Sequence, residues 1–513
     1  MSIALPVPLN QDHHVQHALE TWPDRGPASL PVPNPSKSFW IDSSPDANVL
    51  AVEGSNGPLT TDVDVCIIGS GITGVSVAYH LAKLVQAKSE FGLKSPVHAV
   101  VLEARDFCSG ATGRNGGHMS AHGFFDFASD SAAFGVEEAV RAVKIEDYVV
   151  DELAKIIREN GLQDTVDMTE GGRTALGLTD AEMVYAKTSY ESAKAAGVDV
   201  SNTTWLTKEE VRQQYGASFP AFHTPGRNVW PLKLVTHLYR IAKSISPSFL
   251  LALHTRTPVT TITPAPFDSP RRWRLQTSRG TISCSYVVHA TNGYASYLLP
   301  QFSGYNSIVP VRGQIIATRA NVNLADLTPS AFIANEGFEY WFPRPVKNVN
   351  EKPLVILGGG RETELPHFGM FTTDDSTVNE AVGKVLREFL PSVFPGKFEP
   401  DQEPEMEWTG IMGFTPNHDP FVGPVLDFDA PENGAYEGQF IAAGYSGHGM
   451  PRAYACAEVV ARMVFGELDG SGKWEMPDWL PRHYLTYERT ADKPLTRRQY
   501  EELRKATDAK DRT

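Results

Sequence analysis

VDVCIIGSGITG at residues 63–74 and VHAVVLE at residues 97–103 decide the fold of this chain. The first stretch predicts a buried parallel strand, a tight glycine turn and the start of an amphipathic helix, and the second predicts another apolar strand. Glu103 closes this second strand. A strand, a G-x-G-x-x-G turn, a helix and a strand ending in an acid are the parts of a dinucleotide-binding βαβ unit.

The three glycines of the turn have different tasks. Gly69 permits the turn out of the strand, Gly71 lets the backbone approach a pyrophosphate, and Gly74 lets the helix and the sheet pack closely. Phosphate groups would rest at the helix N-terminus, which carries free amides and the positive end of the helix dipole. Ile72 and Thr73 begin that helix, so they are predicted cofactor contacts.

Glu103 is predicted to accept hydrogen bonds from ribose hydroxyls. It lies further from the turn than the roughly twenty residues that are usual for this motif. The polar insert AKSEFGLKSP at residues 87–96 accounts for the excess as a longer helix end and loop. The motif by itself leaves nicotinamide and flavin cofactors open.

The composition bounds the function. The 513 residues suffice for two domains with substantial cores, or for one large doubly wound sheet with a second lobe. A net charge of −15 argues against nucleic acid or an anionic membrane as the main partner. The four cysteines have neither disulfide-framework nor metal-ligand spacing, so we expect no metal site. We expect no secretory signal and no membrane span, which leaves a cytoplasmic location, and the oligomeric state stays open.

A second glycine-rich stretch, ARDFCSGATGRNGGHMS at residues 104–120, directly follows the predicted ribose acid. Because its side chains are small and its amides are free, it is suited to wrap closely around a cofactor. Arg114 and Asn115 are predicted to contact a phosphate or a ring, and Gly116 and Gly117 to leave room beneath a flat ring. The other predicted cofactor contacts of this stretch are Ala104, Arg105, Ala111, Thr112 and His118.

With DVCIIGSGITG, the acid of VVLEA and SGATGRNGGH, the chain resembles the D-amino-acid oxidase-like superfamily of flavin-dependent oxidoreductases. This superfamily includes glycine oxidase, sarcosine oxidase and gamma-glutamylputrescine oxidase. The resemblance implies an α/β fold of two lobes. One lobe would be a Rossmann-like FAD-binding domain of the glutathione-reductase type, interleaved with an antiparallel-sheet substrate domain. Relatives with covalent flavin use a cysteine just before the segment resembling GFTPNHDP, and residues 407–413 hold none, which implies noncovalent FAD.

The expected domains are discontinuous. Residues 62–126, 228–300 and 405–466 are assigned to the FAD-binding domain, and residues 127–227 and 301–404 to the substrate or cap domain. Residues 1–61 form an extended arm, in which SFWID at 38–42 is expected to anchor by burying aromatic rings or to lie at a substrate entrance. His13 and His14 are expected to be solvated, and residues 467–513 to form a peripheral tail. Helices are predicted near residues 134–160, with a solvated acidic face, and near 181–196 and 231–245.

Later segments supply further cofactor contacts by resemblance. GYSGHGM at residues 444–450 lies between a predicted strand and a predicted helix. A helix start at this place would stabilise the anionic charge that develops on the flavin during reduction. His448 is either a proton carrier or only a spacer against the flavin. The predicted contacts are Val259, Ala290, Thr291, Asn292, Gly293, Gly413, Gly444, Ser446, Gly447, His448, Gly449 and Met450.

The substrate side is predicted at residues 339–361, EYWFPRPVKNVNEKPLVILGGGR, which are expected to form two strands around a polar turn. The matching strands of the family carry substrate-facing side chains, so Tyr340, Trp341, Arg344 and Arg361 are pocket candidates. Plain sheet packing for the two aromatic residues and ion pairs for the two arginines are the alternatives. An arginine would suit a substrate carboxylate. The catalytic candidates are His448, Tyr340, Arg344 and Arg361.

The chemistry implied by the resemblance is oxidation of a C–N bond in an amine or amino acid. A hydride equivalent passes to flavin N5, an imine forms, and oxygen or another acceptor reoxidises the flavin. Sarcosine oxidase uses a lysine to activate oxygen where this chain has Ile356, so oxidase and dehydrogenase both stay open. The alternatives are an NADPH-dependent flavin monooxygenase, a nicotinamide dehydrogenase and a noncatalytic FAD-binding protein.

Overall fold

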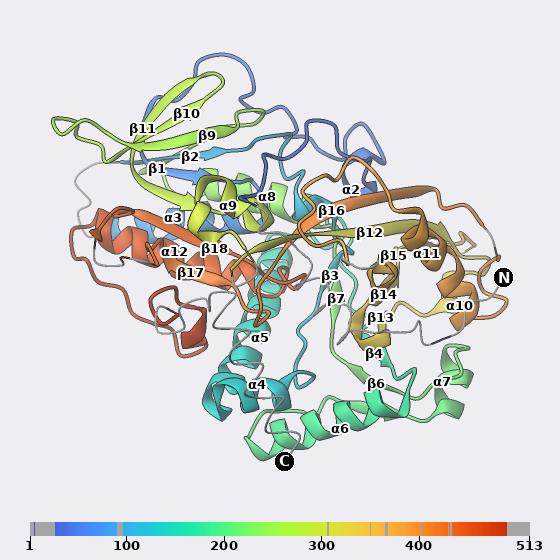
Figure 1. The fold of residues 1–513 in the computed structure, drawn as a ribbon. Coiled ribbons are helices and arrows are strands. Elements are labelled where there is room, and N and C mark those ends of the chain that lie inside the picture. Colours follow the sequence, from blue (N-terminus) through green and yellow to red (C-terminus); the bar gives the residue numbers. More distant parts are fainter. Residues whose placement is uncertain are drawn as a thin grey trace.

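Two eight-stranded sheets organise the protein, seen here in a computed structural model (Figure 1). The structure describes residues 5, 26–89, 96–304, 307–348, 350–364, 368–400, 402–428, 430 and 433–489. His13, His14, residues 90–95 of the polar insert and residues 490–513 of the expected tail lie outside the described residues. Parallel and antiparallel strands both occur, so the predicted mixed α/β fold is confirmed.

The first sheet is built around the predicted βαβ unit. Strand β1 pairs in parallel with both β2 and β11, and β8 and β18 extend the parallel order on the two sides. Antiparallel β17 closes one edge, and β10 and β9 extend from β11. The strands are β1 (Asp62–Ile68), β2 (Val97–Leu102), β8 (Phe249–His254), β9 (Val259–Pro264), β10 (Trp273–Thr277), β11 (Gly280–His289), β17 (Phe421–Pro424) and β18 (Gln439–Ala443). Because parallel strands end at the same edge, Ile68, Leu102 and His289 define the edge where a ligand is expected.

The second sheet has the order β16-β12-β15-β14-β13-β4-β6-β5, and its neighbours are antiparallel except for β13 and β4. Its strands are β4 (Arg173–Leu176), β5 (Thr204–Leu206), β6 (Ala221–Thr224), β12 (Val309–Arg319), β13 (Ala331–Ala334), β14 (Glu339–Pro343), β15 (Leu354–Gly359) and β16 (Met406–Phe414). Strand β16, from a segment that the sequence assigns to the FAD-binding domain, is hydrogen-bonded to β12 in this sheet. A short pair, β3 (His118–Met119) and β7 (Arg227–Asn228), lies outside both sheets.

The helices follow the sequence pattern closely. The helix predicted at 231–245 is α8 with the same bounds, whereas the one predicted at 134–160 is divided at Gly135, where φ is 91°. The helices are α2 (Phe39–Asp42), α3 (Ile72–Ser89), α4 (Phe127–Phe134), α5 (Val136–Glu159), α6 (Asp180–Ala195), α7 (Lys208–Gln214), α8 (Pro231–Ile245), α9 (Ala295–Leu298), α10 (Leu324–Leu327), α11 (Glu380–Val393) and α12 (Ala453–Leu468). Among the described residues, none of these helices has the length and apolarity needed to cross a bilayer.

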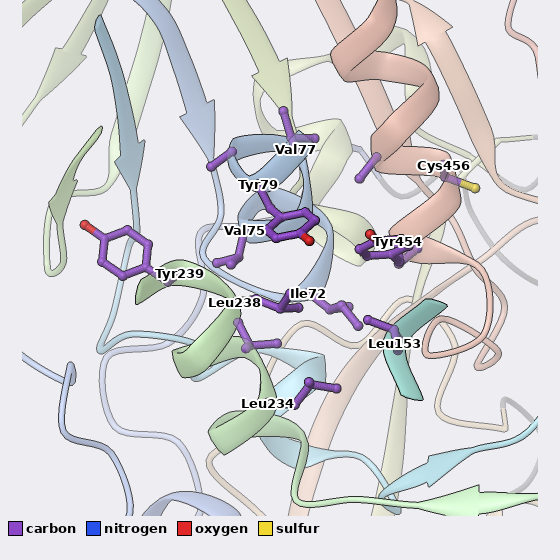
Figure 2. Close-up of a cluster of buried hydrophobic side chains, with 14 of the residues drawn as sticks. Ile72, Val75, Val77, Tyr79, Leu153, Leu234, Leu238, Tyr239, Tyr454 and Cys456 are labelled. Atoms are coloured by element: carbon purple, nitrogen blue, oxygen red, sulfur yellow. The ribbon is translucent and has the colours of Figure 1, made fainter. Parts of the chain in front are cut away.

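Helix α3 is buried on all sides over residues 72–82, more completely than the predicted amphipathic pattern indicates, whereas Lys83, Gln86 and Lys88 further along are exposed. Val75 and Val77 are both fully buried, although they lie on different sides of the helix. Figure 2 shows the reason: α3 packs against Leu238 of α8, Tyr454 of α12 and Leu153 of α5. The helix that follows the glycine turn is therefore fixed on several sides, which holds its N-terminus at the edge of the first sheet.

The N-terminal arm is anchored by aromatic residues, as SFWID predicts. Trp40 is completely buried, and its ring lies 5.7 Å from that of Trp230. Its indole Nε1 donates a hydrogen bond of 2.5 Å to the carbonyl of Asn115, in the second glycine-rich stretch. The arm is thereby attached directly to the predicted cofactor loop.

Candidate active site

A cavity of about 1210 Å³ lies where β1, β2 and β11 end, and both sheets contribute to its wall. Residues 29–31 of the N-terminal arm also line it, so the arm reaches the site at a place other than SFWID. The predicted site residues that line the cavity are Gly69, Gly71, Ile72, Thr73, Glu103, Ala104, Arg105, Ala111, Thr112, Arg114, Asn115, Gly116, His118, Val259, Ala290, Thr291, Asn292, Tyr340, Arg361, Ser446, Gly447, His448, Gly449 and Met450. Residues far apart in sequence thus meet around one space.

The glycine loop is packed tightly against its surroundings. Gly69 has a φ of 110°, and a Cβ at this position would lie 2.5 Å from the carbonyl oxygen of Ala290. A Cβ at Gly74 would lie 1.9 Å from the carbonyl oxygen of Gly69. Thr112 joins the two glycine-rich stretches, because its Oγ1 accepts a hydrogen bond of 3.1 Å from the amide of Ile72. Only glycine fits at these close approaches.

Glu103 stands at the end of β2 and is held by the glycine loop. Its Oε2 accepts hydrogen bonds from the hydroxyl of Ser70 at 2.7 Å and from the amide of Ser70 at 3.1 Å. Its Oε1 accepts one from the amide of Arg105 at 3.0 Å. A carboxylate oxygen can accept more than one hydrogen bond, so Glu103 retains capacity toward a ribose in the cavity.

Arg105 and Arg114 line the cavity, but their charges are compensated within the protein. Arg105 forms an ion pair of 2.8 Å with Asp375, and Arg114 Nε lies 3.5 Å from the same carboxylate. Arg114 Nε also donates to the carbonyl of Ser109 at 2.9 Å. Asp375, which the sequence did not single out, therefore fixes the second glycine-rich stretch. The predicted phosphate contacts of these arginines stay predictions.

Two residues of the cavity wall have a buried polar atom without a hydrogen-bond partner. Thr291 Oγ1 and His118 Nε2 are buried, and neither has a hydrogen-bond partner among the described residues. Both residues line the cavity and both are predicted cofactor contacts. Since buried polar atoms normally find a partner, the wall is suited to a bound molecule with polar edges. With the glycine loop and Glu103, these groups fit a dinucleotide cofactor.

Five predicted cofactor contacts lie behind the cavity wall rather than on it: Gly74, Gly117, Gly293, Gly413 and Gly444. A Cβ at Gly117 would lie 2.9 Å from the carbonyl oxygen of Val229, and one at Gly293 would lie 2.4 Å from that of Met412. These positions need glycine because two segments of the chain approach each other there. The close packing at Gly74 is the role that the sequence predicts for it, and the predicted cofactor contacts of the five glycines stay predictions.

Tyr340 and Trp341 point to opposite faces of β14, as neighbouring residues of a strand do. Tyr340 lines the cavity, and its ring lies 5.6 Å from that of His118. Burial raises the pKa of Tyr340 to about 12, so its hydroxyl stays protonated and can donate. Trp341 instead stacks on Phe332 at 5.2 Å in the core beyond the sheet, which corrects its prediction as a pocket residue.

The two arginines of the predicted substrate strands have different surroundings. Arg344 does not line the cavity: it is buried in an ion pair with Asp167, 4.9 Å from the ring of Trp230. It therefore supports the fold, which corrects its prediction as a catalytic residue. Arg361 does line the cavity, with Phe414 at 4.8 Å from its guanidinium. Within the described residues, no acceptor forms a hydrogen bond or ion pair with this guanidinium.

His448 lines the cavity and is paired with a buried acid. Its Nε2 lies 3.2 Å from Glu146 Oε2, and its ring lies 3.8 Å from that of His122. Burial lowers the pKa of His448 to about 4, although the Glu146 carboxylate acts in the opposite direction. The imidazole is therefore uncharged at neutral pH, with Nε2 as the nitrogen that donates to Glu146.

Glu146 corrects the expectation that the acids of helix α5 form a solvated face. It is 2% exposed and also accepts hydrogen bonds from Arg452 Nε at 2.7 Å and from the amide of His122 at 2.6 Å. Burial raises its pKa, but the interactions with His448 and Arg452 outweigh this and hold the pKa well below its usual value. The sequence carried a signal, because Glu146 lies three residues before the buried Val149 and so shares the apolar stripe of the helix.

Asp130 of α4 lines the cavity and gives a prediction on pH. Burial and the neighbouring Asp419 and Asp126 raise its pKa from 3.8 to about 7. The contribution of this raised pKa to the stability of the folded protein is fully present below pH 3.8 and is lost as the pH rises to about 7. We therefore expect Asp130→Asn to raise the thermal midpoint relative to wild type more at pH 8 than at pH 4. Thermal unfolding measures the midpoints, and an equal difference between variant and wild type at pH 4 and pH 8 would contradict this prediction.

The chain is similar in sequence to known proteins over most of its length. The family model described as FAD dependent oxidoreductase (DAO) matches residues 64–463. The chain is 24% identical over 457 residues to the probable oxidoreductase OrdL of Rhizobium meliloti (strain 1021), covering 85% of this chain and 89% of the relative. It is 23% identical over 442 residues to gamma-glutamylputrescine oxidoreductase of Escherichia coli (strain K12), covering 84% and 90%.

A solved structure supports the same fold. The crystal structure of glycine oxidase from Geobacillus kaustophilus has a TM-score of 0.58 at 21% identity, covering 79% of this chain and 95% of that one. The family match spans both sheets, the glycine loop, Glu103 and the cavity between them. On this evidence the chain belongs to the DAO family of FAD-dependent oxidoreductases, and its cofactor is FAD.

Proposed function

We propose that the protein oxidises the C–N bond of a carboxylated amine or amino acid to an imine. The observation that carries this proposal is the single cavity, which joins the glycine loop and Glu103 to Tyr340 and the unpaired Arg361. The names of gamma-glutamylputrescine oxidoreductase and glycine oxidase among its relatives support an amine or amino-acid substrate. Arg361 would bind the carboxylate by paired charge-assisted hydrogen bonds.

FAD, when bound, supplies the acceptor for the hydride equivalent that leaves the donor carbon. Tyr340 places a neutral hydroxyl beside the donor, where it can orient a carboxylate or an amine. His448 donates through Nε2 to Glu146, so its Nδ1 is an unprotonated ring nitrogen that can accept a hydrogen bond from the substrate amine. A neutral amine is the form that can lose a hydride equivalent, and water would hydrolyse the resulting imine.

We infer that FAD is held without a covalent bond. All four cysteines, which lie in the described part of the chain, are buried free thiols, and none lines the cavity. The first sheet supports an FAD-binding domain of the glutathione-reductase type. It has parallel strands in the order β18-β11-β1-β2-β8, and the antiparallel strands β9 and β10 extend from it. The domain division and the cytoplasmic location stay predictions from the sequence.

The proposal predicts a yellow protein whose visible flavin spectrum bleaches without oxygen when a carboxylated amine or amino acid is added. The panel should pair each carboxylated compound with the same amine lacking the carboxylate, because the unpaired Arg361 predicts preference for the first. Bleaching only by NADPH would favour the monooxygenase, and a colourless protein that takes up no FAD would contradict the proposal. A yellow protein inert to every member would favour a noncatalytic role.

Reoxidation of the flavin distinguishes oxidase from dehydrogenase. Ile356 is completely buried in the core, and no lysine is among the described residues that line the cavity. The lysine that sarcosine oxidase uses toward oxygen therefore has no counterpart at this position. Turnover with oxygen and with an artificial acceptor, compared under the same conditions, decides between the two.

A further inference from the structure

We propose that Arg173 forms a second anion-binding position in the cavity, so that the substrate carries two anionic groups, one at Arg361 and one at Arg173. This rests on the proposed function and specifies its substrate class as an amine bearing two carboxylates or equivalent anions. Arg173 was not singled out by the sequence. It begins β4 and lines the same cavity as Arg361.

Arg173 is buried without full compensation. It is 3% exposed, its Nε has no hydrogen-bond partner among the described residues, and one NH2 donates to the carbonyl of His122 at 3.0 Å. Burial lowers its pKa to about 10, and the Glu146 and Asp126 carboxylates offset part of this. Because Arg173 lines the cavity, an anionic ligand there would stabilise this buried guanidinium, whose hydrogen-bonding capacity is only partly used.

The acids nearest to Arg173 already have other partners. Glu146 is paired with Arg452 and His448, and Asp126 lies 2.8 Å from His122 Nδ1. Neither carboxylate forms an ion pair with Arg173 within the described residues. The charge of Arg173 is therefore available to a ligand.

Arg361 has separate surroundings. Its guanidinium lies over the rings of Phe414 at 4.8 Å and Phe338 at 5.4 Å. Burial lowers its pKa, and Glu362 and Tyr340 offset this. None of these neighbours contacts Arg173, so the two guanidinium groups occupy distinct places on the wall.

The sheet sets the separation of the two arginines. Strands β14 and β13 lie between β15, which Arg361 follows, and β4, which Arg173 begins. Neighbouring strands are about 4.8 Å apart, so the two strands are roughly 14 Å apart across three steps. The register places Arg173 in line with Ile356 of β15, and Arg361 follows further along the chain, so the two arginines are also offset along the strands. Such spacing favours two anionic groups over one carboxylate held by both arginines.

The acidic wall near α4 does not cancel this pair of charges. Asp419 is paired with His483 at 3.1 Å and with Arg452 at 3.4 Å. Asp130 has a pKa raised to about 7 by burial and by the neighbouring carboxylates, so a large share of it is uncharged at neutral pH. These two acids therefore leave the charges of Arg361 and Arg173 largely uncompensated.

The test measures binding of simple acids rather than turnover. Succinate, glutarate and adipate are each compared with the monocarboxylate of the same carbon number, by titration of the flavin spectrum and by calorimetry. We expect the wild type to bind at least one dicarboxylate about tenfold or more tightly than its matched monocarboxylate. Arg173→Gln and Arg361→Gln should each reduce this preference to about one, and Arg173→Lys should retain part of it.

A matched control is Arg227→Gln. Arg227 lies close to β4 in the fold but forms ion pairs with Glu170 at 3.0 Å and Asp151 at 3.2 Å, and it does not line the cavity. The control variant should keep the preference for the dicarboxylate. An unaltered flavin spectrum in Arg173→Gln shows that this variant is folded and holds FAD.

Three outcomes would overturn the inference. In the first, the wild type binds no dicarboxylate more tightly than its matched monocarboxylate. In the second, Arg173→Gln keeps the preference for the dicarboxylate. In the third, Arg173→Gln loses affinity for dicarboxylates and monocarboxylates equally. The last outcome would mean that Arg173 binds the same carboxylate as Arg361 or only supports the fold. If amines bleach the wild-type flavin but one of these outcomes occurs, this inference is wrong and the proposed function stands. If the wild type is colourless, the proposed function itself is wrong.

Discussion

Gly74→Ala is expected to leave the purified protein with little or no bound FAD. The added Cβ would lie 1.9 Å from the carbonyl oxygen of Gly69, and this atom belongs to the backbone of the turn itself. Overpacking of this kind costs about 1–3 kcal/mol or more, and here it must displace the loop or the enclosed helix α3. Because the cavity begins at Gly69 and Gly71, a displaced loop no longer presents its amides to the cofactor.

The ratio of flavin to protein absorbance measures the effect, and we expect a fall of about tenfold or more. Gly26→Ala is the control, because a Cβ at Gly26 meets nothing within 4 Å. This control variant should bind FAD like the wild type. Full flavin content in Gly74→Ala would show that the turn is not the cofactor loop.

Arg344→Ala is expected to destabilise the protein strongly without removing a substrate contact. The substitution leaves Asp167 without its buried cation and empties the space beside Trp40 and Trp230, whose rings lie 5.0 Å and 4.9 Å from the guanidinium. Breaking a buried ion pair costs about 3–5 kcal/mol, and the partial exposure of Asp167 reduces this to about 2–4 kcal/mol. Denaturant unfolding followed by tryptophan fluorescence measures the change.

The matched control is Arg319→Ala, which removes a more exposed pair with Glu405 and should change the unfolding free energy by less than about 1 kcal/mol. Folded Arg344→Ala should keep its affinity for carboxylated ligands. If Arg344→Ala is as stable as the wild type but has lost this affinity, Arg344 contacts the substrate after all.

The local parts of the fold were predictable because their signals lie close together in sequence. The apolar runs and glycines gave β1, the turn and β2, and Pro231 marked the start of α8. The enclosure of α3 was not predictable, because helices α5, α8 and α12 that cover it come from distant segments. Periodicity indicates that one side of a helix is apolar, but it does not show that the other sides are also covered, as they are in α3 over residues 72–82.

For the candidate site, the glycine loop, Glu103 and the strand that carries Tyr340 were predictable, since each belongs to a short motif. The charges of the site depend on contacts between distant segments. Arg344 and Arg361 look alike in sequence, yet one is paired with Asp167 and the other faces the cavity unpaired. Arg173 was missed for the same reason. Whether a charge is compensated depends on a partner that folding brings close from a distant part of the chain, and no local pattern encodes that partner.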